Sequence, residues 1–282
     1  GNKFNYLTPP ELLAGRYDNK WAGIISAIIS LVMLIPYSSV QLMGIGILVN
    51  GLSGGEIPYY MGIIVMALFS CFAALWAGMR SVSWTDAFQA ITMLITALIA
   101  LFYIIFHFFG TPVDFFIDIT KFHPDLLQLN WSPQLFIGLA LPWAFFALTN
   151  PQVSQRMFVP NSVNSLRRMI VYFSIFGFIY TIISTMFGFQ AAKIVPGLSN
   201  ADKAMANLLT KIPSPLALLI FIGIFAAATS TLGSIILTLS SLICRDIVKN
   251  IAPKLDEDSE LNYGKISIPI LIIACVGFAL ER

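Results

Sequence analysis

Long apolar segments alternate with short polar ones along the whole chain. Seven of these segments are long enough, or nearly so, for the roughly 20 apolar residues that a bilayer core requires. They cover residues 21–49, 60–79, 87–109, 135–148, 169–191, 216–243 and 266–280. A chain that crosses a bilayer must satisfy its backbone N–H and C=O groups without water, and a helix does so internally. The pattern predicts an all-α integral membrane protein with about seven transmembrane helices.

The composition supports this class of protein. Hydrophobic residues make up 57% of the chain, charged residues only 11%, and the mean hydropathy is +0.83. A soluble domain carries roughly 25% charged residues. The net charge of +2 does not indicate a nucleic-acid partner, because the Lys and Arg residues follow the membrane topology.

The distribution of these Lys and Arg residues predicts the orientation in the membrane. With the segment before the first span on the cytoplasmic side, eleven of the sixteen lie inside and four lie in outside loops. Cytoplasmic loops carry such an excess. We therefore expect a multi-pass protein of the plasma membrane whose residues before the first span are cytoplasmic.

The ends of the chain favour a piece of a longer protein. It begins with Gly1 without a signal-peptide pattern, and its last span reaches almost to Arg282. We expect residues 1–282 to form a single transmembrane domain that is incomplete at both ends. Its partners are then the lipid bilayer and the missing upstream and downstream helices.

Prolines interrupt two of the spans. Pro36 lies inside the first, where it predicts a kink that frees a backbone carbonyl. The fourth span is short, contains Pro142 and runs into Asn150-Pro151. A short, proline-containing span indicates a discontinuous helix at a transporter binding site. A slightly short helix with a proline kink is an equally simple alternative.

The sixth span carries hydroxyl side chains at membrane depth. Small and hydroxyl residues recur there at steps of four and three, at Ala227, Thr231, Ser234, Thr238 and Ser241. They therefore share one face of a helix. The Ala227 carbonyl and the hydroxyls of Ser230 and Thr231 can converge, and small hard cations prefer such neutral oxygens. The pattern predicts an ion site in a membrane transporter, with small-residue helix packing as the alternative.

Three further stretches, together with this span, resemble the solute:sodium symporter family, and its sodium/proline branch in particular. They are Thr-Pro-Pro-Glu-Leu-Leu-Ala-Gly-Arg-Tyr at 8–17, Val-Ser-Trp-Thr-Asp-Ala-Phe-Gln at 82–89 and Asn-Pro-Gln-Val-Ser-Gln-Arg at 150–156. The resemblance implies a partial leucine-transporter-like inverted-repeat fold covering core helices three to nine. The fourth span then corresponds to one of the family's two broken helices.

The resemblance also implies an ion pathway. The sodium ligands would be the Ala227 carbonyl and the Ser230 and Thr231 hydroxyls, completed by a helix that the chain lacks. Gly233 stands where many relatives carry Asp, so a second sodium ion depending on that Asp is in doubt. Asp86 would line the route by which sodium leaves toward the cytoplasm. Its alternative role is that of an acid at the N-terminus of the third span, favoured by the helix dipole.

A substrate cavity is implied by the same resemblance. Its residues would be Tyr37, Gln41, Trp143, Phe146 and Pro151. An aromatic wall with few hydrogen-bonding groups suits a small, partly apolar solute better than a sugar. Lipid contact or ordinary packing is the alternative for each aromatic side chain.

These observations favour sodium-coupled secondary active symport of a small organic solute by alternating access, with the sodium ion as the coupling cofactor. Proline or another amino acid is the first expectation for the solute, followed by pantothenate or a short monocarboxylate. We expect no enzyme, because an intramembrane enzyme would need a nucleophile, a base or metal ligands at membrane depth. The competing hypothesis is a symporter-like membrane sensor domain of a signalling protein.

Overall fold

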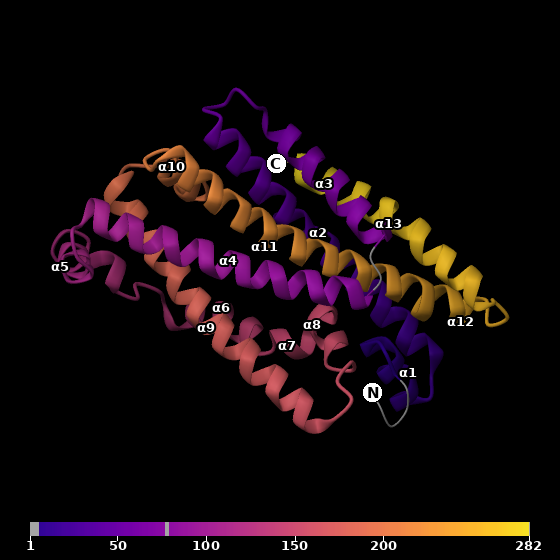
Figure 1. Cartoon of the computed structure of the whole chain (residues 1–282). Helices are drawn as coiled ribbons and strands as arrows, with labels where there is room; N and C mark the ends of the chain where they lie inside the picture. The colour runs from indigo at the N-terminus through magenta and orange to yellow at the C-terminus, as the bar shows by residue number, and fades with distance from the viewer. Residues whose placement is uncertain (1–5, 77–78, 282) are drawn as a thin grey trace.

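The computed structural model describes residues 6–76 and 79–281. These residues form helices joined by short connections (Figure 1). The helices are α1 (Pro9–Tyr17), α2 (Lys20–Leu52), α3 (Tyr59–Trp76), α4 (Met79–Phe108), α5 (Pro112–Phe122), α6 (Pro133–Ala144), α7 (Phe146–Thr149), α8 (Pro151–Arg156), α9 (Val163–Ile194), α10 (Ala204–Leu209), α11 (Ser214–Ser241), α12 (Lys249–Ile251) and α13 (Glu257–Leu280). The helical segments η1 (Pro124–Leu127), η2 (Ala201–Lys203) and η3 (Leu242–Val248) lie between them, and η3 is a π-helix.

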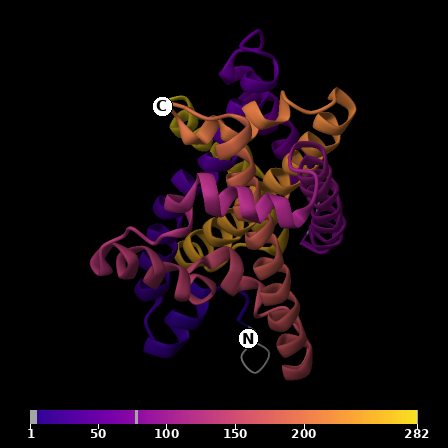
Figure 2. The ribbon, with the colours of Figure 1, turned by 90° about the vertical axis from the view of Figure 1, so that its left-hand side faces the viewer.

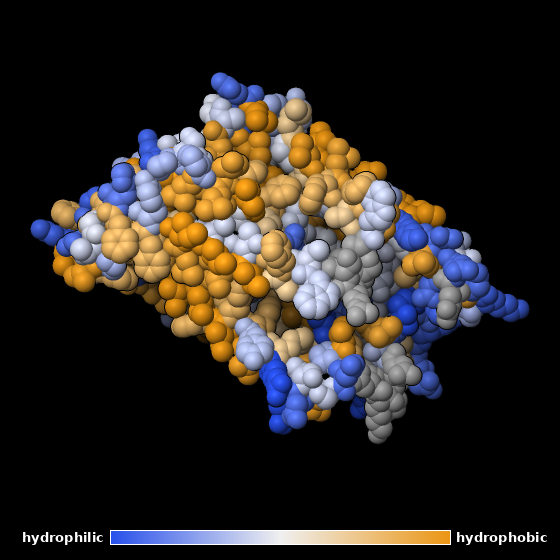
Figure 3. All heavy atoms as spheres, viewed as in Figure 1, coloured by the Kyte–Doolittle hydropathy of each residue, from blue (hydrophilic) through white to orange (hydrophobic). Residues whose placement is uncertain are grey.

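Six of the seven expected spans are confirmed as long apolar helices. Within the described ranges, α2, α3, α4, α9, α11 and α13 are long and apolar enough to cross a membrane. The fourth expected span, 135–148, is divided between α6 and α7 and is too short in either piece. Residues 77 and 78, at the end of the second expected span, lie outside the described residues. Apolar atoms cover the middle of the visible surface and hydrophilic atoms gather toward its ends (Figure 3), as a protein that crosses a bilayer requires.

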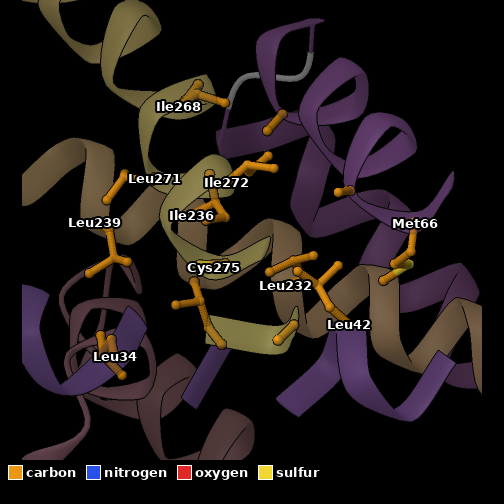
Figure 4. Packing of buried hydrophobic residues seen from close by; sticks show 14 of the residues in the cluster. Leu34, Leu42, Met66, Leu232, Ile236, Leu239, Ile268, Leu271, Ile272 and Cys275 are labelled. Carbon is orange, nitrogen blue, oxygen red and sulfur yellow. The ribbon is translucent and has the colours of Figure 1, made fainter. Parts of the chain in front are cut away.

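The largest buried cluster joins α2, α3, α11 and α13. Leu42 on α2, Met66 on α3, Leu232 on α11 and Cys275 on α13 are all completely buried. Figure 4 shows these side chains pointing toward one another from the four helices. Helices in a bilayer associate through close van der Waals packing, so such a core holds them in a fixed arrangement.

Close backbone approach sets the crossing of α4 and α11, which pack along each other. A Cβ added at Gly223 on α11 would lie 2.1 Å from Oγ1 of Thr96 on α4. Glycine is therefore required for the observed distance between these helices. This packing matters for the site because it brings Asp86 of α4 against the hydroxyl residues of α11.

Pro36 does not break the first span, because α2 continues from Lys20 to Leu52 through this residue, and the expected kink stays a prediction. Proline removes one N–H donor from the helix. The hydroxyls of Ser38 and Ser39 donate to the carbonyls of Leu34 and Ile35 at 2.7 and 2.9 Å. Neither bond reaches the carbonyl of Val32, which is the acceptor that Pro36 leaves without its helical N–H partner.

The connections at one end of the bundle are packed onto the long helices. α5 lies across the end of these helices (Figures 1 and 2), with Phe115 and Ile119 buried beneath it. Lys193 Nζ on α9 reaches Asp118 Oδ1 on α5 at 2.6 Å. This ion pair attaches α5 to α9.

Candidate functional site

The expected discontinuous helix is confirmed at the segment that carries Trp143 and Pro151. α6 ends at Ala144, α7 begins at Phe146, and a second break at Asn150 precedes α8. Asn150 has extended backbone angles, φ −80° and ψ 115°, because proline disfavours a helical conformation in the residue before it. The Asn150 side chain then caps α8 by accepting from the Gln152 N–H at 2.9 Å. The breaks lie after Pro142, which α6 includes within its last turn.

The hydroxyl face of α11 is arranged partly as expected. The Thr231 hydroxyl donates to the Ala227 carbonyl at 3.0 Å, so these two oxygens are adjacent. The Ser230 hydroxyl instead donates to Asp86 Oδ1 on α4 at 2.6 Å. Ala227, Ser230 and Thr231 are all half-buried, which leaves this face of α11 open to a further ligand or helix.

Asp86 does not lie at the N-terminus of a helix, so its alternative role as an acid at a helix N-terminus is wrong. α4 begins at Met79, so Asp86 lies two turns inside it. Its carboxylate accepts from Ser230 through Oδ1 and from Ser234 through Oδ2, the latter at 3.0 Å. A carboxylate therefore lies beside the predicted ion-binding hydroxyls, where the sequence indicated neutral oxygens alone.

Arg156, the last residue of α8, completes this arrangement. Its Nη2 donates to Asp86 Oδ2 at 2.6 Å and also to the Ser234 hydroxyl. The Asp86 side chain is 12% exposed and that of Arg156 is 40% exposed. A carboxylate so withdrawn from water needs a charged or hydrogen-bonding partner, and this one has both. We call Asp86, Arg156, Ser230 and Ser234 the polar network.

The polar network connects three helices that are far apart in the sequence. α4 supplies the carboxylate, α8 the guanidinium and α11 the two hydroxyls. A second bond between α8 and α11 runs from Gln155 Nε2 to the Ser241 hydroxyl at 3.3 Å. The second short segment of the broken helix is thus attached to the helix that carries the predicted sodium ligands.

Sequence reasoning missed the role of Arg156. The signal that could have found it is the rarity of ionisable residues next to membrane spans, where such residues usually pair with one another. Which acid meets which base still depends on the packing of α4, α8 and α11, because 70 residues separate Asp86 from Arg156.

Three of the five expected cavity residues form one aromatic group. The rings of Tyr37 and Phe146 meet edge-on with centroids 6.4 Å apart, and those of Trp143 and Phe146 lie 5.0 Å apart. Tyr37 comes from α2, so the group joins α2 to the broken helix. Gln41 lies one turn further along α2 and is half-buried, whereas Pro151 is buried at the start of α8, beyond the second break.

Comparison with known proteins gives consistent results. The sequence profile of the sodium:solute symporter family matches residues 2–281. The chain is 24% identical over 297 residues to the uncharacterized symporter YhjB of Bacillus subtilis (strain 168), covering 98% of this chain and 57% of that protein. It is 25% identical over 303 residues to the sodium/glucose cotransporter of Vibrio parahaemolyticus, covering 95% of this chain and 55% of that protein. The chain therefore spans just over half the length of these relatives.

The fold is shared with a solved transporter structure. A Na⁺-coupled sialic acid symporter, in a substrate-bound outward-open state, superposes with a TM-score of 0.81 at 20% sequence identity. The match covers 99% of this chain and 62% of that structure. This similarity confirms the expected all-helical, partial leucine-transporter-like fold.

Proposed function

Because the chain belongs to the sodium:solute symporter family, we propose that it is the central part of a transporter that couples the entry of sodium to the uptake of a small organic solute. The observation that carries the proposal is the open hydroxyl face of α11 beside the polar network. Ala227 and Thr231 present two adjacent oxygens there, and Ser230 lies within the same turn. Oxygen ligands of this kind suit a small hard cation.

The proposed sodium site uses the Ala227 carbonyl and the Ser230 and Thr231 hydroxyls. Thr231 can keep its bond to Ala227 and still offer a lone pair to the ion, because a hydroxyl both donates and accepts. Ser230 already donates its hydrogen to Asp86, so its oxygen lone pairs are available in the same way. The remaining ligands would come from a helix outside this chain.

The polar network gives the proposed exit route a physical form. On the expected orientation, α8 and the end of α11 lie toward the cytoplasm. Arg156 then ties α8 to both α4 and α11 on the cytoplasmic side of the sodium site. We propose that this contact closes the route past Asp86, so that release of the ion requires Arg156 to separate from Asp86.

The proposed solute contacts the aromatic group of Tyr37, Trp143 and Phe146. Trp143 is 68% exposed, so its ring is available to a ligand or to a missing helix. Aromatic faces offer large apolar contact and few hydrogen bonds, which favours proline or another small amino acid over a sugar. Pantothenate and short monocarboxylates satisfy the same chemistry.

The test is uptake into proteoliposomes that contain the full-length protein. Labelled proline is supplied under an inward sodium gradient, with potassium replacing sodium in the comparison. We expect sodium-dependent uptake that the double variant Ser230→Ala/Thr231→Ala abolishes. The control is Thr181→Ala/Thr185→Ala, which removes two exposed hydroxyls that bond within α9. An uptake rate that depends neither on sodium nor on the α11 substitutions would refute the ion site.

A panel of solutes separates the ion from the substrate. If proline is not transported, the same vesicles are tested with pantothenate, short monocarboxylates and glucose. Sodium-driven uptake of any of the first two classes would support an aromatic, sparsely hydrogen-bonding site. Sodium-driven uptake of glucose alone would contradict the assignment of Trp143 and Phe146 as the wall of the solute site.

A further inference from the structure

A second site of mixed polarity opens where α3, α11 and α13 diverge, away from the predicted ion and solute sites. Its volume is about 850 Å³. Trp76 at the end of α3, Ser241 at the end of α11 and Gly264 on α13 are among the residues that surround it. On the proposed orientation, this cavity lies at the cytoplasmic surface of the membrane. We call it the interfacial cavity.

Positive charge predominates in the interfacial cavity. Its described lining contains Arg245, Lys249 and Lys265, against one acid, Glu260. Glu260 is shared: Lys249 Nζ lies 2.7 Å and Arg245 Nη1 4.0 Å from its two oxygens. Arg245 also pairs with Glu11 of α1 at 3.0 Å. Lys265 takes part in none of these pairs and is exposed, so it is free to meet an anion.

The other half of the lining is apolar. Leu75 and Trp76 on α3 and Leu261 on α13 expose between 42% and 75% of their surface. Tryptophan is enriched at the boundary between lipid and water, where its ring stays with the lipid and its N–H reaches polar groups. A free inorganic anion would use the basic half alone. An amphiphile would use both halves.

We propose that the interfacial cavity binds an anionic phospholipid of the cytoplasmic leaflet. Its phosphate group would lie between Lys265, Lys249 and Arg245, and an acyl chain would run along Trp76 and Leu261. Basic pockets between membrane helices on the cytoplasmic side are typical sites for such head groups. The bound lipid would connect α3, η3 and α13, and so would stabilise the four-helix core without entering the transport path.

The experiment measures lipid binding to the full-length protein by native mass spectrometry. Phosphatidylglycerol is compared with phosphatidylcholine of the same chain length. We expect a preference for phosphatidylglycerol that Lys249→Gln/Lys265→Gln weakens roughly thirtyfold, since each basic residue near the surface contributes a factor of about five. The matched control is Lys254→Gln, which removes an exposed charge from the same region outside the cavity.

A variant that is expected to strengthen lipid binding distinguishes a loss of affinity from misfolding. Glu260→Gln removes the acid that competes for Lys249 and Arg245, so it should strengthen binding of phosphatidylglycerol several-fold. A merely misfolded protein would not gain affinity. Equal binding of the two lipids, or unchanged binding in the double lysine variant, would overturn the proposal.

The source of the phosphate is tested separately. Glycerol 3-phosphate has the charged group without acyl chains, and Leu261→Ser removes apolar surface without changing charge. We expect glycerol 3-phosphate to bind far more weakly than the lipid and Leu261→Ser to weaken the lipid alone. Equal binding of glycerol 3-phosphate would assign the cavity to a soluble phosphate and refute the lipid.

Discussion

Replacing Arg156 with glutamine should open the route on the cytoplasmic side of the predicted sodium site. The substitution removes the guanidinium that lies 2.6 Å from Asp86 and also bonds Ser234. Glutamine keeps a polar side chain of moderate length but carries no charge and cannot reach both partners. α8 would then be attached to α11 chiefly through Gln155 and Ser241.

The size of the effect follows from the geometry of the ion pair. A hydrogen bond between charged groups contributes about 1.5–3 kcal/mol. Arg156 is 40% exposed, and solvent screening reduces the value of such a pair. We therefore assign about 1–2 kcal/mol to the contact, which corresponds to a roughly 5- to 30-fold rise in the population of the open form. Arg156→Lys keeps the charge but loses the planar fork, so its effect should be intermediate.

The assay labels a cysteine introduced at Ser154 in the full-length protein. Ser154 lies on α8 and is 8% exposed in this structure, so a maleimide supplied on the cytoplasmic side should react with it slowly. The labelling rate should rise 5- to 30-fold in Arg156→Gln, after subtraction of labelling at the native Cys71, Cys244 and Cys275. Arg167→Gln is the control, because Arg167 is exposed on α9.

Two results would refute this reasoning. Labelling of Ser154→Cys that is unchanged by Arg156→Gln would mean that the polar network does not hold α8 in place. An equal increase in Arg167→Gln would mean that the loss of any positive charge has the same effect.

Three further predictions concern the packing around the site. Gly223→Ala should lower the thermal unfolding midpoint of the full-length protein, because overpacking against Thr96 costs about 1–3 kcal/mol. Gly223→Ala/Thr96→Gly should restore much of the lost stability, and a single substitution without effect would contradict the close approach of the two helices. Thr8→Ala should destabilise α1 by about 1–3 kcal/mol in denaturant unfolding, because Thr8 caps that helix and donates to the buried Asp246 at 2.8 Å. Thr8→Ser keeps the hydroxyl and should be nearly neutral, so an equal loss of stability in both variants would mean that the hydroxyl is not the cause. Asn150→Ala should raise the labelling rate of Ser154→Cys because it removes the cap of α8, whereas Asn150→Asp should not, since a carboxylate caps equally well. Identical labelling rates in the two variants would exclude the cap as the cause.

The sequence predicts the long helices and the broken segment for a simple physical reason. Apolar side chains are favourable in the bilayer core, so each transmembrane helix corresponds to a continuous apolar run in the sequence. The break is also encoded locally, because proline at 151 forces Asn150 out of the helical conformation. Pro36 shows the limit of this reasoning, because the same residue type lies inside α2 without breaking the helix.

The start of α4 could not be read from hydropathy. The apolar run begins at Ala87, but the helix begins at Met79 and includes the more polar turns before it. Hydropathy marks the part of a helix that lies in lipid, whereas backbone hydrogen bonds continue wherever packing permits. Hydropathy alone therefore puts Asp86 at a helix end, whereas in the structure Asp86 lies within α4 and accepts hydrogen bonds from Ser230 and Ser234.

The uneven distribution of packing indicates which part of the chain moves. α2, α3, α11 and α13 share a large apolar core with many completely buried side chains, and disturbing it would expose all of them together. α8 contributes no side chain to this core, and hydrogen bonds from Gln155 and Arg156 attach it to α4 and α11. Segments with few apolar contacts open at low free-energy cost. Motion between the two states of a transporter should therefore occur in the broken helix, with α11 and its predicted sodium ligands remaining in the fixed part, and the Asp86–Arg156 contact is the bond that such a motion must break.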